Sequence, residues 1–212
     1  MQSKLPYVLV MAHRKGGTGK STIACNILAE FSKKVKTTLI DADSQQHTFK
    51  FNSKRKNPAP VANIKNVKEL VEFLQQDDGL TIIDLGGYDS EFARAVLAYS
   101  DMVITPLSDS EFELDGLVDF TSVLNNVITK SKREDIKPFI LTNSVHFNDK
   151  STQKAFKTYA KNNMYEVFDT VIANRKIYKN ILSKGKSVSE IEPFGKAAKE
   201  IDSLIDEIIE KA

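Results

Sequence analysis

A glycine-rich stretch near the start of the chain has the residue types that bind phosphate. It spans residues 13–22, HRKGGTGKST, after a short apolar run and before a segment with helical periodicity. Glycines let backbone N–H groups turn inward onto phosphate oxygens, and the following helix adds the positive end of its dipole. Lys20 would reach the β and γ phosphates, and the Ser21 hydroxyl would bind Mg²⁺. We therefore predict a nucleotide-phosphate site made by Lys15, Gly16, Gly17, Thr18, Gly19, Lys20, Ser21 and Thr22.

The stretch departs from the strict phosphate-loop pattern at one end. Arg14 stands where the pattern Gly-x-x-x-x-Gly-Lys-Ser/Thr has its first glycine, and Lys15 adds a second lysine. The alternative reading is a glycine-rich turn with lysines present by chance. The strand-like run before it and the helix-like run after it favour the phosphate site.

Three aspartates follow strand-like runs. Asp41 and Asp43 end one such run, and Asp84 ends the run at 80–83. Because the carboxyl ends of strands in an open α/β sheet meet at one crevice, we expect these carboxylates near the glycine-rich stretch. Ser21 and Asp84 would then hold Mg²⁺, and Gly87, in Asp-x-x-Gly spacing after Asp84, could sense a γ phosphate. The alternative is that the aspartates only end strands at turns.

Apolar runs with strand character alternate with runs of helical spacing. The expected strands cover 7–12, 38–40, 80–83, 102–105 (ended by Pro106), 139–142 and 167–172. The expected helices cover 21–33, 67–74, 92–99, 114–128, 152–159 and 195–211, and 44–64 is expected to be irregular. Near-continuous apolar strands alternating with helices predict an α/β fold of three layers, with a mostly parallel twisted sheet and helices on both faces.

The charge is near zero in total but segregated along the chain. The 212 residues carry 30 Lys and Arg against 28 Asp and Glu, a formal net charge of +2. That total excludes a generic polybasic binder and an acidic solvating tail. By segment the charge is +9 over 1–66, −10 over 67–136, +7 over 137–189 and −4 over 190–212. These blocks are either solvated surface or localised binding surfaces.

Cysteine and histidine content excludes two further classes. Cys25 is the only cysteine, so no disulfide framework exists within the chain, as fits a reducing compartment. His13, His47 and His146 lack metal-ligand spacing. The apolar run at 7–12 is too short for a membrane span or a secretory signal. We expect a soluble, cytoplasmic protein.

Several motifs together resemble those of the ParA/MinD ATPases. Residues 15–21, KGGTGKS, are similar to their deviant Walker A loop, and 41–45, DADSQ, to their second motif, usually Asp-x-Asp-Pro-Gln. Residues 101–107 resemble the strand that follows their second switch, and 111–117 the helix start after it. Residues 171–188 resemble the C-terminal signature of ParA partition proteins. The likeness covers about residues 7–210, and the short ParA type is nearest.

The resemblance implies a P-loop NTPase fold in a single ATPase domain over 1–212, with no N-terminal DNA-binding domain and with ATP/ADP and Mg²⁺ as cofactors. It implies that Lys20 binds ATP within its own subunit and that Lys15 reaches the partner's ATP in an ATP-dependent homodimer. Asp43 would position the attacking water, which makes Lys15, Lys20 and Asp43 the catalytic set, and Asp41 would join Ser21 and Asp84 at the metal. Asn143 would lie at the adenine, and hydrolysis would be slow.

The resemblance also implies partners. The ATP-bound dimer would bind non-specific DNA, and so associate with the nucleoid, until a centromere-binding ParB-like protein stimulates hydrolysis. The DNA-binding residues would be Arg175, Lys176, Lys179, Lys184 and Lys186. Two residues depart from the family pattern: Ser44 replaces the usual proline and His13 the usual asparagine.

Three alternatives stay open. A ParA-like positioner of protein cargo would use the same DNA track, and a metabolic enzyme such as dethiobiotin synthetase would need a small-molecule site. A MinD-like protein would bind lipid through its C-terminal helix. Here that helix carries acidic side chains that repel anionic lipid, so no membrane partner is expected; they are Glu200, Asp202, Asp206, Glu207 and Glu210.

Overall fold

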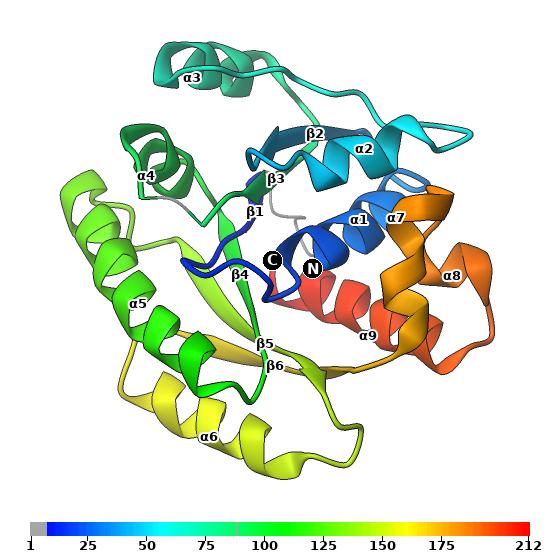
Figure 1. Ribbon diagram of the computed structural model, residues 1–212. Coiled ribbons are helices and arrows are strands. Elements are labelled where there is room, and N and C mark those ends of the chain that lie inside the picture. Colours follow the sequence, from blue (N-terminus) through cyan, green and yellow to red (C-terminus); the bar gives the residue numbers. More distant parts are fainter. Residues whose placement is uncertain (1–7, 88) are drawn as a thin grey trace.

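Six strands form one sheet in which the described pairings are all parallel (Figure 1). The computed structural model describes residues 8–87 and 89–212, so Tyr7, expected to begin the first strand, lies outside them. The strands are β1 (Val8–Met11), β2 (Thr37–Ala42), β3 (Leu80–Leu85), β4 (Met102–Leu107), β5 (Lys137–Val145) and β6 (Glu166–Ala173). Their order is β2-β3-β1-β4-β5-β6, so the loop after β1 opens at the centre of the sheet.

Helices cover both faces of this sheet, as predicted (Figure 1). One face packs against α1 (Lys20–Phe31), α2 (His47–Ser53), α7 (Ile181–Lys184), α8 (Val188–Ile191) and α9 (Lys196–Lys211). The other packs against α3 (Val67–Gln76), α4 (Glu91–Ala98), α5 (Glu111–Ser131) and α6 (Lys150–Lys161). A 3₁₀ helix, η1 (Lys176–Asn180), joins β6 to α7.

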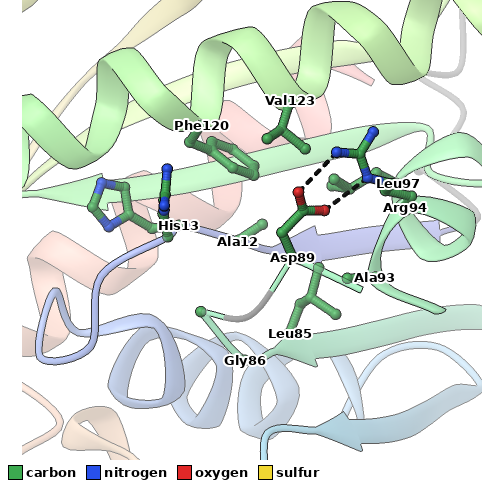
Figure 2. A pocket seen from close by; sticks show the side chains of 12 residues that line it. Ala12, His13, Leu85, Gly86, Asp89, Ala93, Arg94, Leu97, Phe120 and Val123 are labelled. Carbon is green, nitrogen blue, oxygen red and sulfur yellow. Dashed lines mark hydrogen bonds and ion pairs between the residues drawn. The ribbon is translucent and has the colours of Figure 1, made fainter. Parts of the chain in front are cut away.

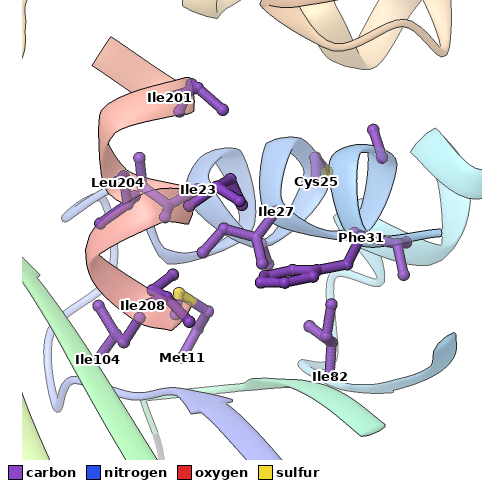
Figure 3. Packing of buried hydrophobic residues seen from close by; sticks show 14 of the residues in the cluster. Met11, Ile23, Cys25, Ile27, Phe31, Ile82, Ile104, Ile201, Leu204 and Ile208 are labelled. Atoms are coloured by element: carbon purple, nitrogen blue, oxygen red, sulfur yellow. The ribbon is translucent and has the colours of Figure 1, made fainter. Parts of the chain in front are cut away.

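Strand side chains alternate between the two apolar cores. Met11 points into the core beneath α1 and α9, whereas its neighbour Val10 points into the core beneath α4 and α5. Figure 3 shows Met11 and Ile104 facing Ile27 of α1 and Leu204 of α9. Because both faces are covered, each strand needs apolar residues at successive positions, which explains the near-continuous apolar runs.

The C-terminal helix is a core helix. Its apolar stripe is buried against α1 and β6 and consists of Ile201, Leu204, Ile205 and Ile208. Cys25 lies in the same core, where burial raises the pKa of its thiol. Within the described ranges, no helix is both long and apolar enough to cross a bilayer.

The expectation that 44–64 is irregular was wrong for α2. Thr48, Phe51 and Asn52 lie on one buried face of this helix. Asn52 then fixes the following loop, because its side-chain amide exchanges hydrogen bonds of 2.8 and 2.9 Å with the backbone of Ala59. The helix is only two turns long, too short to produce a clear helical period amid lysines and prolines.

Two further expectations need correction. Strand β4 does not end before Pro106 but continues to Leu107, paired with β5. The Ile104 carbonyl accepts a hydrogen bond from the Ala12 N–H, just past β1. Pro106 is two residues further on and its backbone nitrogen faces the same side, where β1 has already ended. The backbone N–H that proline lacks is therefore not needed for strand pairing there. Residues 176–191, to which no elements were assigned, form η1, α7 and α8.

Candidate nucleotide-binding site

The glycine-rich loop leads directly from β1 into α1. Gly17 and Gly19 adopt φ values of +87° and +93°, which favour glycine. A Cβ on Gly19 would lie 2.3 Å from the Asn143 side-chain nitrogen, so a larger residue is excluded by space as well. The loop therefore presents its backbone and the N-terminus of α1 to a common point, as an anion-binding loop requires.

Lys20 lies inside this loop and Lys15 at its rim. Lys20 is 5% exposed, and its Nζ donates a hydrogen bond of 3.0 Å to the Lys15 carbonyl. Burial lowers the pKa of Lys20, while the charges of Asp84 and Asp43 oppose that shift. The Lys15 side chain is exposed and its Cγ packs close to Gly116 of α5. The two lysines thus face different surroundings.

Asp84 is the penultimate residue of β3, and the register pairs it with both Met11 and Asp41. Its side chain is fully buried, and burial raises its pKa to about 6 against the opposing hydroxyls of Thr48 and Ser21. The Thr48 hydroxyl donates to Oδ2 at 2.5 Å. The other oxygen, Oδ1, has no hydrogen-bond partner among the described residues.

This arrangement fits a magnesium nucleotide. A buried polar oxygen without a partner costs free energy, and a cation at Asp84 Oδ1 would remove that cost. The available donors are carboxylate and hydroxyl oxygens, which Mg²⁺ prefers. The described residues contain no cluster of three or more His, Cys, Asp or Glu that could hold a metal alone. Phosphate oxygens would therefore complete the coordination that Ser21 and Asp84 begin.

Asp41 lies in β2 opposite Asp84, and Asp43 follows directly after this strand. Both Asp41 oxygens accept backbone N–H groups, from Asp43 at 3.1 Å and from Phe49 at 2.7 Å. Burial raises the pKa of Asp41, and these N–H groups oppose the shift. Asp43 Oδ1 accepts the Gln45 N–H at 2.8 Å. Asp41 thus shapes the turn into α2, and the metal role predicted for it stays a prediction.

A hollow of about 210 Å³ adjoins the loop on its β5 and β6 side. Its lining includes Gly17, Thr22, Asn143, Arg175 and Lys179. The Asn143 amide donates to the Thr18 carbonyl at 2.7 Å, so it holds the loop as well as lining the hollow. The adenine contact predicted for Asn143 stays a prediction.

The segments after β3 and β4 pack directly on the loop. A Cβ on Gly87 would lie 2.3 Å from the Arg14 carbonyl, and one on Gly116 would lie 2.6 Å from Lys15 Cγ. Both glycines are therefore sites of close approach. Gly87, predicted as a γ-phosphate sensor, is in contact with the start of the loop.

His13 lines a small apolar pocket beside these segments (Figure 2). Its Nδ1 accepts the Lys15 N–H at 3.1 Å, so Nε2 carries the proton and donates to the Glu113 carbonyl at 3.2 Å. The ring is 2% exposed, and burial lowers its pKa to about 4. Phe120 lines the same pocket, and the Asp89–Arg94 ion pair of 2.7 Å lies at its far side. A neutral His13 therefore ties the loop to the start of α5.

The predicted DNA-binding residues divide into two groups. Arg175 points inward, with Nε and Nη2 at 2.9 and 2.6 Å from Glu200, which raises the pKa of Arg175. The Tyr178 hydroxyl donates to the same carboxylate at 2.9 Å. The remaining members are exposed: Lys176, Lys179, Lys184 and Lys186.

Two functional neighbours escaped the sequence interpretation. Thr48 lay in a segment expected to be irregular, and only its spacing from Phe51 hinted at a buried helical face. Glu200 was read as part of an acidic solvent face, although its side chain is largely buried against Arg175. No local pattern links it to a residue 25 positions earlier.

A parallel α/β sheet with this loop, this helix N-terminus and these carboxylates is a P-loop nucleotide-binding domain, with an ATPase fold. The family follows from comparison with known proteins. Residues 9–189 match the model of the CobQ/CobB/MinD/ParA nucleotide binding domain, and the chain belongs to this family. The predicted resemblance to ParA/MinD proteins is confirmed.

Similar proteins span nearly the whole chain. The maintenance of carboxysome distribution protein A of Halothiobacillus neapolitanus is 23% identical over 217 residues, 99% of each chain. The structure of apo McdA from Cyanothece has a TM-score of 0.72 at 18% identity, covering 95% of this chain and 98% of that one. A plasmid partition protein from Borrelia burgdorferi bound to AMPPNP has a TM-score of 0.68 at 20% identity, covering 97% and 99%. These structures establish the shared fold.

Proposed function

We propose that the protein is a slow, Mg²⁺-dependent ParA-type ATPase whose ATP-bound homodimer binds DNA without sequence specificity. The observation that carries this is the division of the two loop lysines. Lys20 is buried beside Asp84, whereas Lys15 is exposed at the rim. One lysine suffices for a phosphate loop within one subunit, so the second is available for the nucleotide of a second copy.

The hydrolysis chemistry rests on charge neutralisation. Ser21 and Asp84 would hold Mg²⁺, which supplies positive charge at the β and γ phosphates. Lys20 adds a second cation from within the loop, and Lys15 of the other subunit adds a third. Asp43 accepts a hydrogen bond from the attacking water. No strong nucleophile lies among these residues, which supports slow turnover.

The exposed lysines of η1, α7 and the turn after α7 support the DNA-binding part of the proposal. Lys176, Lys179, Lys184 and Lys186 all face solvent within a short stretch. Neutralising phosphates with them would make binding strongly salt-dependent. Arg175 contributes by fixing this stretch to α9 through Glu200. A ParB-like partner protein would stimulate hydrolysis and release the DNA.

A second candidate differs only in cargo. The carboxysome distribution relative aligns along 99% of this chain. This similarity favours a protein that positions protein cargo and uses the same DNA as its track. A lipid partner is disfavoured, because the apolar stripe of α9 is packed in the core.

Retention on a random DNA duplex, measured with ATP, ADP and no nucleotide, tests the proposal. We expect retention only with ATP and Mg²⁺, and a steep loss as salt rises. Lys15→Ala should keep ATP affinity but lose ATP-dependent dimers and DNA retention, whereas Arg14→Ala serves as the neighbouring control. DNA retention that is equal with ADP and ATP, or a normal dimer from Lys15→Ala, would refute the proposal.

A further inference from the structure

Helix α2 is bonded at its first turn to the carboxylates of the nucleotide site. The Thr48 side chain is completely buried, and its hydroxyl donates to Asp84 Oδ2 at 2.5 Å. The next residue, Phe49, donates its backbone N–H to Asp41 Oδ2 at 2.7 Å. A shift of either carboxylate would therefore displace the first turn of α2.

The other end of α2 is bonded to the segment that carries two of the exposed lysines. Arg55 makes two hydrogen bonds of 2.9 Å to the Glu190 carboxylate of α8. The Arg55 side chain is only 6% exposed and lies over the Phe51 ring, 5.4 Å from its centroid. The Lys54 ammonium donates to the Leu182 carbonyl at 3.2 Å.

Backbone contact strengthens this second attachment. A Cβ on Gly185 would lie 2.7 Å from the Lys54 carbonyl carbon, so the turn after α7 sits directly on the end of α2. Glu190 also accepts the Ser187 N–H at 2.8 Å as part of the capping box of α8. Lys184 and Lys186 lie between these anchoring points. Bonds to α1 also hold this stretch, from the Ser187 hydroxyl to Glu30 at 2.8 Å and from the Val188 N–H to Asn26 at 2.9 Å, so α2 sets one side of their placement.

We propose that α2 couples occupancy of the nucleotide site to the placement of residues 181–191. In this arrangement Thr48 is a positioning residue for Asp84, and Arg55 with Glu190 passes movement of α2 to Lys184 and Lys186. A cation held at Asp84 Oδ1 competes with the Thr48 hydrogen bond for the charge of the same carboxylate. A helix of seven residues, about 10 Å long, moves as a unit when its first turn is displaced.

The inference rests on the proposed function, for which it supplies the route from ATP to the basic segment. Such coupling requires that the ligand favours one of two arrangements, and it acts in both directions. DNA bound at Lys184 and Lys186 should therefore tighten Mg²⁺-nucleotide binding by the factor by which the nucleotide tightens DNA binding.

Backbone hydrogen exchange at 181–191 tests the coupling without relying on DNA or on hydrolysis. The probe is Mg²⁺ with a non-hydrolysable ATP analogue. We expect it to change exchange rates in this segment by about tenfold in the unmodified protein. Thr48→Val should abolish most of this response and weaken the effect of Mg²⁺ on nucleotide affinity, whereas Thr48→Ser, which keeps the hydroxyl, should restore both.

The double variant Arg55→Met/Glu190→Leu cuts the other end without changing net charge. It should bind Mg²⁺-nucleotide within about threefold of the unmodified protein, yet lose the exchange response at 181–191. The control Lys157→Met/Asp169→Leu removes an ion pair of 2.6 Å between α6 and β6 and should retain the response. If Thr48→Val does not fold, this pair of variants decides the question.

The outcomes separate this inference from the function on which it rests. A segment 181–191 that does not respond to Mg²⁺-nucleotide, or that responds as fully in Arg55→Met/Glu190→Leu as in the unmodified protein, overturns the coupling. A normal exchange response without ATP-dependent DNA retention instead overturns the proposed function and leaves the coupling in place.

Discussion

The phosphate-binding loop and the basic segment after β6 differ in how far the buried carboxylate beside each one is hydrogen-bonded. Beside the loop, Asp84 Oδ1 and the Thr18 hydroxyl lack partners among the described residues. After β6, the Glu200 carboxylate accepts two bonds from Arg175, one from Tyr178 and a longer one of 3.4 Å from the Ala173 N–H. The Asp84 carboxylate keeps an oxygen free for a ligand, whereas the Glu200 carboxylate is fully paired and holds the exposed lysines in place.

The largest expected effect is on the phosphate-binding loop. Lys20→Ala removes a cation that is buried near Asp84, so nucleotide affinity should fall by about 100-fold, roughly 2.8 kcal/mol. Calorimetric titration with the ATP analogue measures this. Folding of the nucleotide-free chain should change little, and a variant that binds nucleotide normally would mean that the loop does not hold the phosphates.

The basic segment after β6 should respond in stability. Glu200→Ala leaves the partly buried Arg175 and Tyr178 without their acceptor, and the free energy of unfolding should drop by about 2 kcal/mol. Urea unfolding checks this. Arg175→Met/Glu200→Leu removes both charges and should lose less. An equal loss in the two variants would show that packing, not the paired carboxylate, stabilises the segment.

The pH dependence of the free energy of unfolding should report on the loop region through His13. Its pKa is about 4 in the fold and near 6.5 when unfolded, so between these values the unfolded chain binds more protons. Stability from this group is present above pH 6.5 and is lost as the pH falls toward 4. Asp84, raised to about 6, has the opposite slope. The free energy of unfolding of the unmodified chain, minus that of the His13→Asn variant, should therefore rise by about 2 kcal/mol from pH 4 to 7. A flat difference would mean that His13 is protonated in the fold.

The smallest effect should come from a single exposed lysine. Lys186→Ala should weaken DNA binding only about twofold to threefold at moderate salt and lower the slope of log affinity against log salt by about one unit. Nucleotide binding and stability should be unaffected. Filter binding across a salt series measures the slope, and an unchanged slope would remove Lys186 from the DNA contact.

The sequence predicted those parts of the site that depend on neighbours along the chain. The loop glycines, Lys20 and the aspartates near the ends of β2 and β3 follow from local spacing, and so does the alternation that gives a parallel sheet. Contacts that close over long separations were not predictable. Thr48 meets Asp84 across 36 positions, and His13 meets Glu113 across 100. Nothing in either local segment encodes such a partner, because the sheet order decides which strand ends meet.

The sole cysteine gives the molecule a practical property. Cys25 is shut inside the core with a raised pKa, so it reacts slowly with thiol reagents while the chain stays folded. A cysteine introduced on the surface, for example Lys184→Cys, would be the one reactive thiol of the protein. A single fluorophore could then be attached to the basic segment in an otherwise unaltered chain, and its motion followed in real time as nucleotide binds.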